Sequence, residues 1–95
     1  MEISWRQRAL EDLETARQYI AAANPRAARR VLEMILAAVS RLPDTPDIGR
    51  PGRVAGTREL VIARTPYIVA YTILGDAVVI LDVLHGAQEW PERLE

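Results

Sequence analysis

Apolar positions in the first half of the chain recur at helical spacing. From about Gln7 to Ala23 they return every three or four residues with acidic residues between them, which predicts an amphipathic helix. Asn24-Pro25 then places a good N-cap before a residue that suits the first helical turn, so a second helix is expected to begin there. Its apolar stripe runs from Ala28 to Leu42 and ends at Pro43. This short junction predicts an antiparallel helical hairpin with one apolar face.

The second half of the chain changes to strand-like patterns. Its β-branched and aromatic runs predict three strands: Glu59–Ala63, Tyr67–Leu74 and Ala77–His85. The two-residue Gly75-Asp76 loop between the last two runs predicts a tight β-hairpin. The segment Pro43–Gly56 is rich in Pro, Gly and Asp and is expected to be an irregular connection, while Ile3–Trp5 suits a short edge strand.

Together these elements predict one α+β domain over residues 1–95. A short N-terminal strand is followed by an antiparallel two-helix hairpin, which packs on a C-terminal antiparallel sheet. The last two strands are apolar on both faces, so they are expected at the centre of that sheet, with Tyr67 and Tyr71 as core or partner-contact residues.

Charge is distributed unevenly along a chain whose formal net charge is only −1. Near-neutrality argues against nucleic-acid binding over the whole surface. Locally, however, four arginines and one acid lie between Arg50 and Arg64, whereas five acids and one arginine lie between Asp76 and the C-terminus. The chain therefore has a basic middle and an acidic tail, which is expected to be solvated.

Several classes of site and of location are excluded by composition. The absence of cysteine rules out disulfides and thiolate metal sites. One histidine and scattered carboxylates do not make a ligand set, so no metal or other cofactor is expected. The apolar runs are far shorter than the ~20 residues of a membrane span, and the N-terminus has no signal pattern. A cytoplasmic protein without a membrane partner is expected.

Short motifs follow one another in order through nearly the whole chain. They are Trp5 with Ala9–Leu13, Asn24–Arg30, Gly49–Gly52, Gly56–Leu60, Tyr67–Tyr71, Val83–Gly86 and Trp90-Pro91. In this order they resemble the RelE/ParE superfamily of toxins from type II toxin–antitoxin systems, which includes the RelE/StbE-like plasmid stabilisation proteins. Such a resemblance defines the superfamily better than the molecular target.

The resemblance implies a RelE/ParE-like fold and two alternative activities. RelE-like members are ribosome-dependent endoribonucleases, or mRNA interferases, which cleave mRNA and inhibit translation, and this is the function expected first for the chain. ParE-like members inhibit DNA gyrase and have no known catalytic site. Both kinds are silenced by a cognate antitoxin whose disordered segment folds around the toxin. The implied partners are therefore a cognate antitoxin and, according to the activity, either the ribosome with mRNA or DNA gyrase. For the oligomeric state, both a homodimer and a toxin–antitoxin hetero-oligomer are considered.

Candidate catalytic groups follow from what RNA cleavage requires: a proton carrier, a cation beside the phosphate and an acid for the leaving oxygen. His85 ends the last strand and is the only side chain with an unperturbed pKa near neutrality, so it is the natural proton carrier. The candidate cations are Arg58 and Arg64 in catalysis and Arg50 and Arg53 in RNA binding. Glu59 is a candidate base if it faces the same side as the arginines.

Two features depart from the nuclease pattern. RelE-like nucleases place a basic residue after the aromatic that begins the central strand, where this chain has Ile68, and they are usually basic and contain lysine. A ParE-like toxin would instead use the helical hairpin and the acidic tail as contact surfaces, with Trp90 as a packing anchor or a partner contact. An inactive relative that only binds its antitoxin is the third hypothesis.

Overall fold

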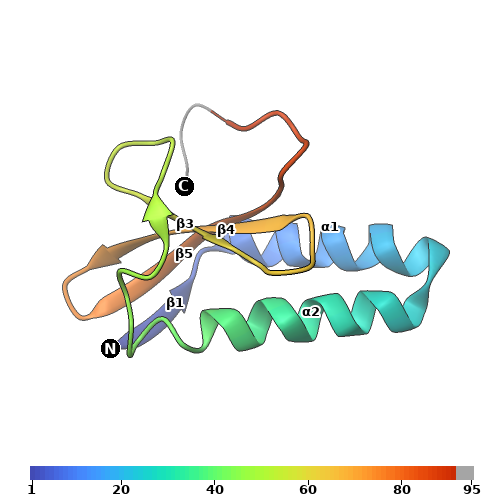
Figure 1. Cartoon of the computed structure of the whole chain (residues 1–95), viewed down its shortest axis with the longest axis horizontal. Coiled ribbons are helices and arrows are strands. Elements are labelled where there is room, and N and C mark those ends of the chain that lie inside the picture. Colours follow the sequence, from blue (N-terminus) through green and yellow to red (C-terminus); the bar gives the residue numbers. More distant parts are fainter. Residues whose placement is uncertain (92–95) are drawn as a thin grey trace.

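A five-stranded mixed sheet carries two helices on one of its faces (Figure 1). The computed structural model describes residues 1–91. Its elements, in chain order, are β1 (Glu2–Trp5), α1 (Gln7–Ala23), α2 (Pro25–Val39), β2 (Arg50–Pro51), β3 (Arg58–Val61), β4 (Tyr67–Leu74) and β5 (Ala77–His85). The predicted α+β fold is confirmed, and α1, β4 and β5 have the predicted bounds.

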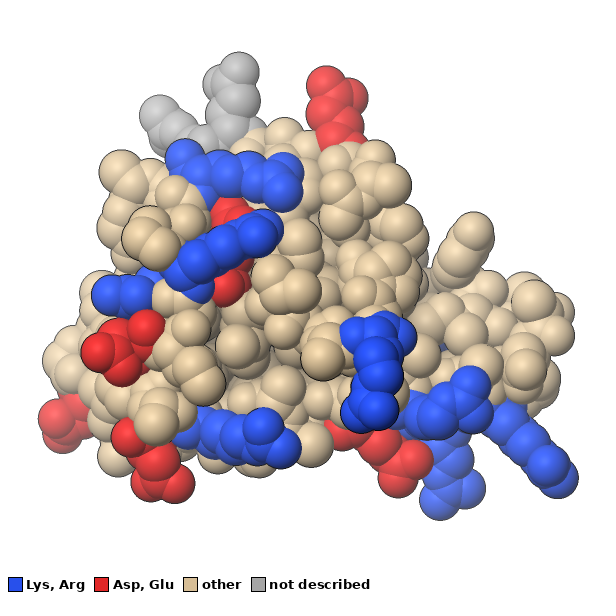
Figure 2. Space-filling model, in the orientation of Figure 1, with Lys and Arg blue, Asp and Glu red and all other residues tan. Residues whose placement is uncertain are grey.

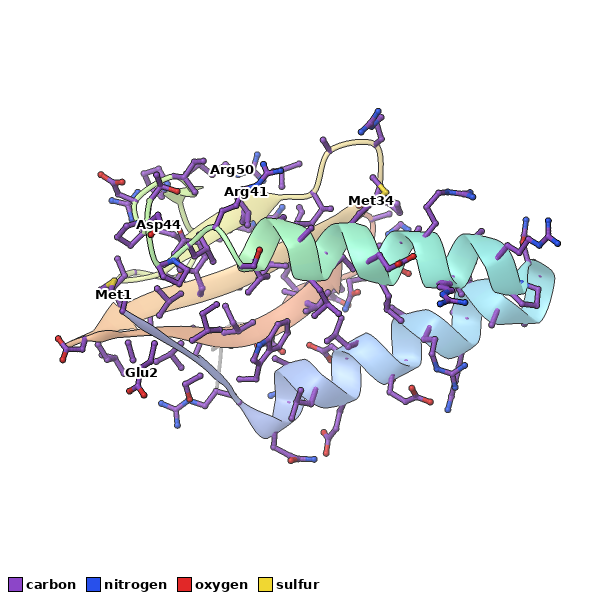
Figure 3. The ribbon with its side chains drawn as sticks, turned by 90° about the horizontal axis from the view of Figure 1, so that it is seen from below. Met1, Glu2, Met34, Arg41, Asp44 and Arg50 are labelled. Carbon is purple, nitrogen blue, oxygen red and sulfur yellow. The ribbon has the colours of Figure 1, made fainter. Side chains whose placement is uncertain are left out.

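The helical hairpin turns at a single residue, Asn24. Its backbone N–H donates to the carbonyl of Ile20 at the end of α1, and its side-chain oxygen accepts the N–H of Ala27 at 3.1 Å, which caps α2. The helices α1 and α2 consequently lie side by side (Figure 3). The helix α2 ends at Val39, three residues earlier than predicted, because Leu42 bonds back to Val39 in a tighter turn.

The sheet has more strands than the predicted three-stranded C-terminal unit. Its order is β1-β5-β4-β3-β2, so β1 pairs in parallel with β5 and is an edge strand, as predicted for the N-terminus. The other edge is β2, a two-residue strand within the segment that was expected to be irregular. A strand of two residues is too short to show a pattern of alternating positions, which explains why the sequence did not predict it.

The turn between β3 and β4 shortens β3 relative to its prediction. The N–H of Ile62 donates to the carbonyl of Tyr67, and the N–H of Thr65 donates to the carbonyl of Ile62. Residues 62 and 63 therefore belong to the turn, whose tip places Arg64 at φ 64°. The β4–β5 turn is the predicted Gly75-Asp76 loop, with Gly75 at φ 56°.

The hydrophobic core lies between the helical hairpin and the adjacent face of the sheet. Both Tyr67 and Tyr71 are buried there, so of the two roles expected for them, core and partner contact, the structure shows the first. The fully enclosed side chains include Ile35, Leu42, Val39, Tyr71, Ile80, Val69 and Val78. On α1, Asp12 reaches the sheet and accepts the N–H of Val83 at 2.9 Å, where β1 no longer covers the edge of β5.

The acidic tail is not uniformly solvated as expected. Asp82 has only 1% of its surface exposed and lies 3.4 Å from the guanidinium Nε of Arg8. Residues 92–95, which include two of the tail's acids, lie outside the described residues. Among the residues described, no helix is long and apolar enough to cross a membrane.

Candidate functional site

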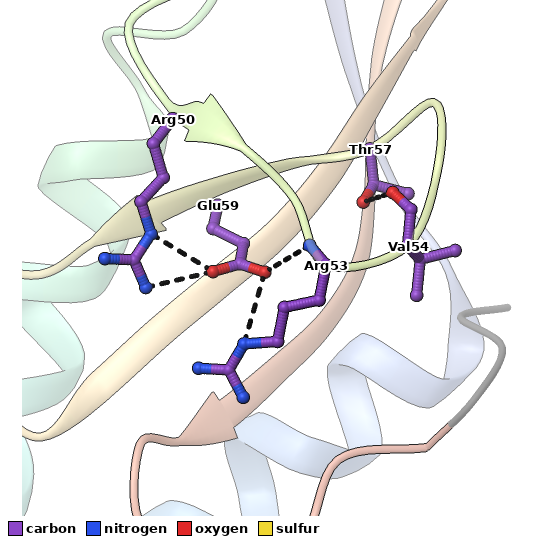
Figure 4. Close-up of polar contacts among 5 residues, drawn as sticks. All are labelled: Arg50, Arg53, Val54, Thr57 and Glu59. Atoms are coloured by element: carbon purple, nitrogen blue, oxygen red, sulfur yellow. Dashed lines mark hydrogen bonds and ion pairs between the residues drawn. The ribbon is translucent and has the colours of Figure 1, made fainter.

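Arg50, Arg53 and Glu59 form a compact cluster, called here the Glu59 cluster, on the sheet face away from the helices (Figure 4). Glu59 is 3% exposed, and its Oε1 accepts from Arg50 Nε at 3.2 Å and Nη2 at 3.0 Å. Its Oε2 accepts the backbone N–H of Arg53 at 2.8 Å and lies 3.6 Å from Arg53 Nε. One buried carboxylate thus holds two half-exposed guanidinium groups.

Strand pairing explains why these residues meet. Arg50 of β2 lies directly opposite Glu59 of β3, and residues paired in this way point to the same face of a sheet. The connecting loop is closed by the N–H of Gly52, which donates to the carbonyl of Thr57, and by Thr57 Oγ1, which donates to Val54 (Figure 4). The loop returns Arg53 to the carboxylate.

Trp90 covers part of the Glu59 cluster. The guanidinium carbon of Arg53 lies 3.7 Å from the centre of a ring of Trp90, a cation–π contact. This contact brings the segment after β5 over the sheet face opposite the helices (Figure 1). Trp90 therefore packs against the protein itself, which is one of the two roles proposed for it.

Arg58 lies on the opposite face of β3, next to the core. It pairs across the sheet with Tyr71, and its Nη1 donates to the carbonyls of Asp47 at 3.1 Å and Gly49 at 2.7 Å. The hydroxyl of Tyr71 accepts the N–H of Gly49 at 2.9 Å and donates to Pro46 at 2.7 Å. Arg58 and Tyr71 together fasten the loop between α2 and β2.

The loop must approach Tyr71 so closely that residue 49 has to be glycine. A Cβ at that position would lie 2.7 Å from the ring of Tyr71. Burial raises the pKa of the Tyr71 hydroxyl, although the hydrogen bond from Gly49 acts in the other direction. Burial also raises the pKa of Tyr67, so both phenols are kept as neutral hydroxyls.

His85 lines a cavity of about 430 Å³ between the second half of α1 and the ends of β4 and β5. Its ring meets Tyr67 edge-on at 5.5 Å, and its Nδ1 accepts the N–H of Ala87 at 3.1 Å. A neutral imidazole that accepts at Nδ1 carries its proton at Nε2, so Nε2 is its remaining hydrogen-bond donor. Tyr19, which is 75% exposed, also lines the cavity.

The predicted site residues consequently lie in four places. Arg50 and Arg53 meet at Glu59, whereas Arg58 lies on the other sheet face and Arg64 at the β3–β4 turn. His85 pairs with Tyr67 and Arg58 pairs with Tyr71, so the two residues are offset by about 13 Å along the strand direction and lie on opposite sides of β4. Glu59 does face Arg50 and Arg53, but its two oxygens are already occupied by them.

Two structural roles were missed from the sequence. Neither the joint anchoring of two arginines by Glu59 nor the contact of Asp12 with β5 has a local signal, because each depends on residues brought together by the fold. The only sign in the sequence that Glu59 has a structural role was its position as a single acid within a β-branched run.

Comparison with solved structures defines the class of protein. The fold matches a structure described as a chromosomal ParDE TA system from P. aeruginosa, with a TM-score of 0.80 and 27% sequence identity over 87% of this chain and 92% of that one. A two-helix hairpin on this mixed sheet is therefore the fold of a type II toxin.

Sequence comparison gives the family. The profile of the ParE toxin of the type II toxin–antitoxin system parDE matches residues 3–90. The chain is 48% identical to the Sinorhizobium fredii protein named Y4kP, over 97% of this chain and 95% of that protein. It is 34% identical to toxin RelE2 of Caulobacter vibrioides, over 92% and 97%. This chain belongs to the ParE toxin family of the RelE/ParE superfamily, and membership supports a cognate antitoxin as its partner.

Proposed function

We propose that this toxin acts by binding a protein target, DNA gyrase, and not by cleaving RNA. The observation that carries the proposal is the internal engagement of the candidate catalytic arginines. Arg50 and Arg53 neutralise a buried carboxylate, and Arg58 is bound to two carbonyls of its own loop. A guanidinium held in this way is not poised to stabilise a phosphate in a transition state.

The distance between His85 and Arg58 supports the same proposal. Phosphoryl chemistry requires the proton carrier and the cation to reach one reacting phosphate, within hydrogen-bond distance of its oxygens. The strand register offsets these residues by about 13 Å along the strand direction, and β4 lies between their two strands. The helix α1 exposes two large apolar side chains, Leu10 at 46% and Tyr19 at 75%. These are the proposed contacts for the protein target.

Cleavage of mRNA on the ribosome is the second candidate function. It is favoured by His85, whose ring lines the 430 Å³ cavity beside Tyr67, and by the 34% identity to a protein named toxin RelE2. In that case His85 would carry the proton, Arg58 and Arg64 would act as cations, and Arg50 and Arg53 would bind RNA after releasing Glu59.

Two parallel assays with the purified chain separate these functions. One measures supercoiling of relaxed plasmid by DNA gyrase with ATP; the other measures cleavage of mRNA on translating ribosomes by primer extension. We expect loss of supercoiling and intact mRNA. Codon-positioned mRNA breaks that disappear in Arg58→Ala and His85→Ala, with supercoiling unaffected, would reject the proposal. Tyr19→Ala, which removes a proposed target contact, is expected to weaken inhibition of gyrase.

A further inference from the structure

The cavity of about 430 Å³ beside His85 is built from separate parts of the chain. They are the second half of α1, the ends of β4 and β5, and the segment after β5. Ala16, Val83 and Ala87 supply apolar side chains, one from each part of this wall. A recess of this size, with an apolar wall and a few polar groups, is typical of a site for a small organic molecule.

Tyr67 contributes a buried hydroxyl that has no partner inside the protein. The residue is 6% exposed, and within residues 1–91 its hydroxyl makes no hydrogen bond. Tyr71, on the same strand, is different, since its hydroxyl accepts from Gly49 and donates to Pro46. Buried polar groups are nearly always hydrogen-bonded. Because Tyr67 lines the cavity, its hydroxyl is placed to find that partner in a bound molecule.

Two more hydrogen-bond donors line the same cavity. His85 Nδ1 accepts from Ala87, so the proton of a neutral ring is on Nε2, and no described residue accepts it. The ring of His85 meets that of Tyr67 edge-on at 5.5 Å, so the two side chains form one wall. Gln88 uses its Oε1 to accept the N–H of His85, which leaves its NH2 group as a donor. This side of the cavity therefore favours a ligand that offers an acceptor.

The charge of the cavity limits which acceptor fits. Asp12 is the only charged residue among those that line it. Its Oδ2 accepts the N–H of Val83, and its Oδ1 has no hydrogen bond within residues 1–91. The positive charge lies elsewhere: Figure 2 shows basic side chains gathered at the end of the hairpin where α1 meets α2, and further basic side chains spread along α2. A phosphate or carboxylate is thus disfavoured beside Asp12, whereas an N–H donor is favoured.

We propose that this cavity binds a small, uncharged, planar carboxamide or lactam, a molecule with a carbonyl oxygen next to an N–H. The carbonyl oxygen accepts from Tyr67 and His85, and the N–H donates to Asp12. The flat ring lies against the apolar wall and the ring of Tyr19, which is 75% exposed. The inference rests on the cavity alone, and it holds whether the toxin acts on gyrase or on RNA.

Benzamide is the probe, because it is a planar, uncharged carboxamide. Benzoate is its matched control, since it has the same ring and nearly the same shape but carries a negative charge. Each is titrated into the full, isotopically labelled chain and followed through the backbone amide signals in two-dimensional NMR spectra. We expect benzamide to shift the signals of Ala87 and Gln88 saturably, with a Kd of about 1 mM, an ordinary affinity for so small a molecule. Benzoate should bind at least about tenfold more weakly.

Two variants test whether the bound molecule contacts the cavity. Tyr67→Phe deletes only the unpartnered hydroxyl, so the chain should stay folded and should bind benzamide about fivefold more weakly. Tyr71→Phe is the matched control, because it deletes a hydroxyl of the same strand that does not line the cavity, and its affinity should equal that of the natural chain. The proposal is overturned by the absence of saturable shifts, by benzoate binding as well as benzamide, or by equal affinities of Tyr67→Phe and Tyr71→Phe.

Discussion

The Glu59 cluster and the exposed arginines on and beside α2 use the same side chain in opposite ways. In the Glu59 cluster, two guanidiniums surround a carboxylate that is 3% exposed, so their charge is largely satisfied inside the protein. The exposed arginines on and beside α2, in contrast, face solvent without internal partners in the described part of the chain; they are Arg26, Arg29, Arg30, Arg41 and Arg64. An arginine-rich stretch of sequence is therefore a poor guide to function until the groups that each guanidinium contacts within the fold are known.

The largest expected effect comes from removing the centre of the Glu59 cluster. Glu59→Ala leaves two arginines without their carboxylate and the N–H of Arg53 without its acceptor. Because both arginines are about half exposed and water can solvate them, we expect a loss of about 2 kcal/mol in unfolding free energy, less than for a fully buried pair. Urea denaturation measures it. Glu33→Ala on α2 is the matched control and should change the unfolding free energy by less than about 0.5 kcal/mol. Equal losses in the two variants would contradict the stabilising role of the Glu59 cluster.

A second prediction concerns the hydroxyl of Tyr71, which fastens the loop between α2 and β2 to the sheet. Tyr71→Phe removes the hydroxyl that accepts from Gly49 and donates to Pro46, leaving two backbone groups of the loop without a partner. We expect a cost of about 1.5 kcal/mol in unfolding free energy. Tyr19→Phe, at a tyrosine that is 75% exposed, should be nearly neutral in the same denaturation experiment. A Tyr71→Phe protein as stable as the natural chain would mean that the loop is held by Arg58 alone.

The smallest expected effect is in the hairpin and depends on pH. Glu14 accepts from Arg17 and Gln18, and these bonds lower the pKa of its carboxyl from 4.5 to about 2. A carboxyl with a depressed pKa in the folded state stabilises the protein fully above pH 4.5, and this contribution disappears as the pH falls toward 2. Urea midpoints between pH 6 and pH 2 should therefore fall slightly less in Glu14→Gln than in the natural chain. Identical pH profiles would show that this exposed ion pair contributes nothing.

The sequence predicted the elements better than the site, for a physical reason. Helical and alternating periodicity, the Asn24-Pro25 junction and the Gly75-Asp76 turn are local signals. The elements α1, β4 and β5 formed where these signals indicated, and α2 began there but ended three residues earlier. The two-residue β2 has no periodicity of its own, because it exists only through pairing with β3.

The candidate site depends on which side chains meet after folding. Arg50, Arg53 and Arg58 look equivalent along the chain, yet Arg58 faces the core side of β3 while the other two face away from it. Adjacent residues on a strand point to opposite faces, so this separation was implicit in the period of two. The burial of Glu59 and of Asp82 could not be predicted from this alternation, because it depends on the loop before β3 and on the segment after β5.

The growth of bacteria that express His85→Asn tests the central claim most directly, namely that this toxin acts without RNA chemistry. Asparagine retains a hydrogen-bond acceptor for the N–H of Ala87 but cannot carry a proton near neutral pH. Induced without its antitoxin, the variant is predicted to arrest growth as strongly as the natural chain, with cellular mRNA intact. Normal growth with a folded variant that still binds the antitoxin, together with the loss of mRNA breaks that the natural chain produces, would contradict the account.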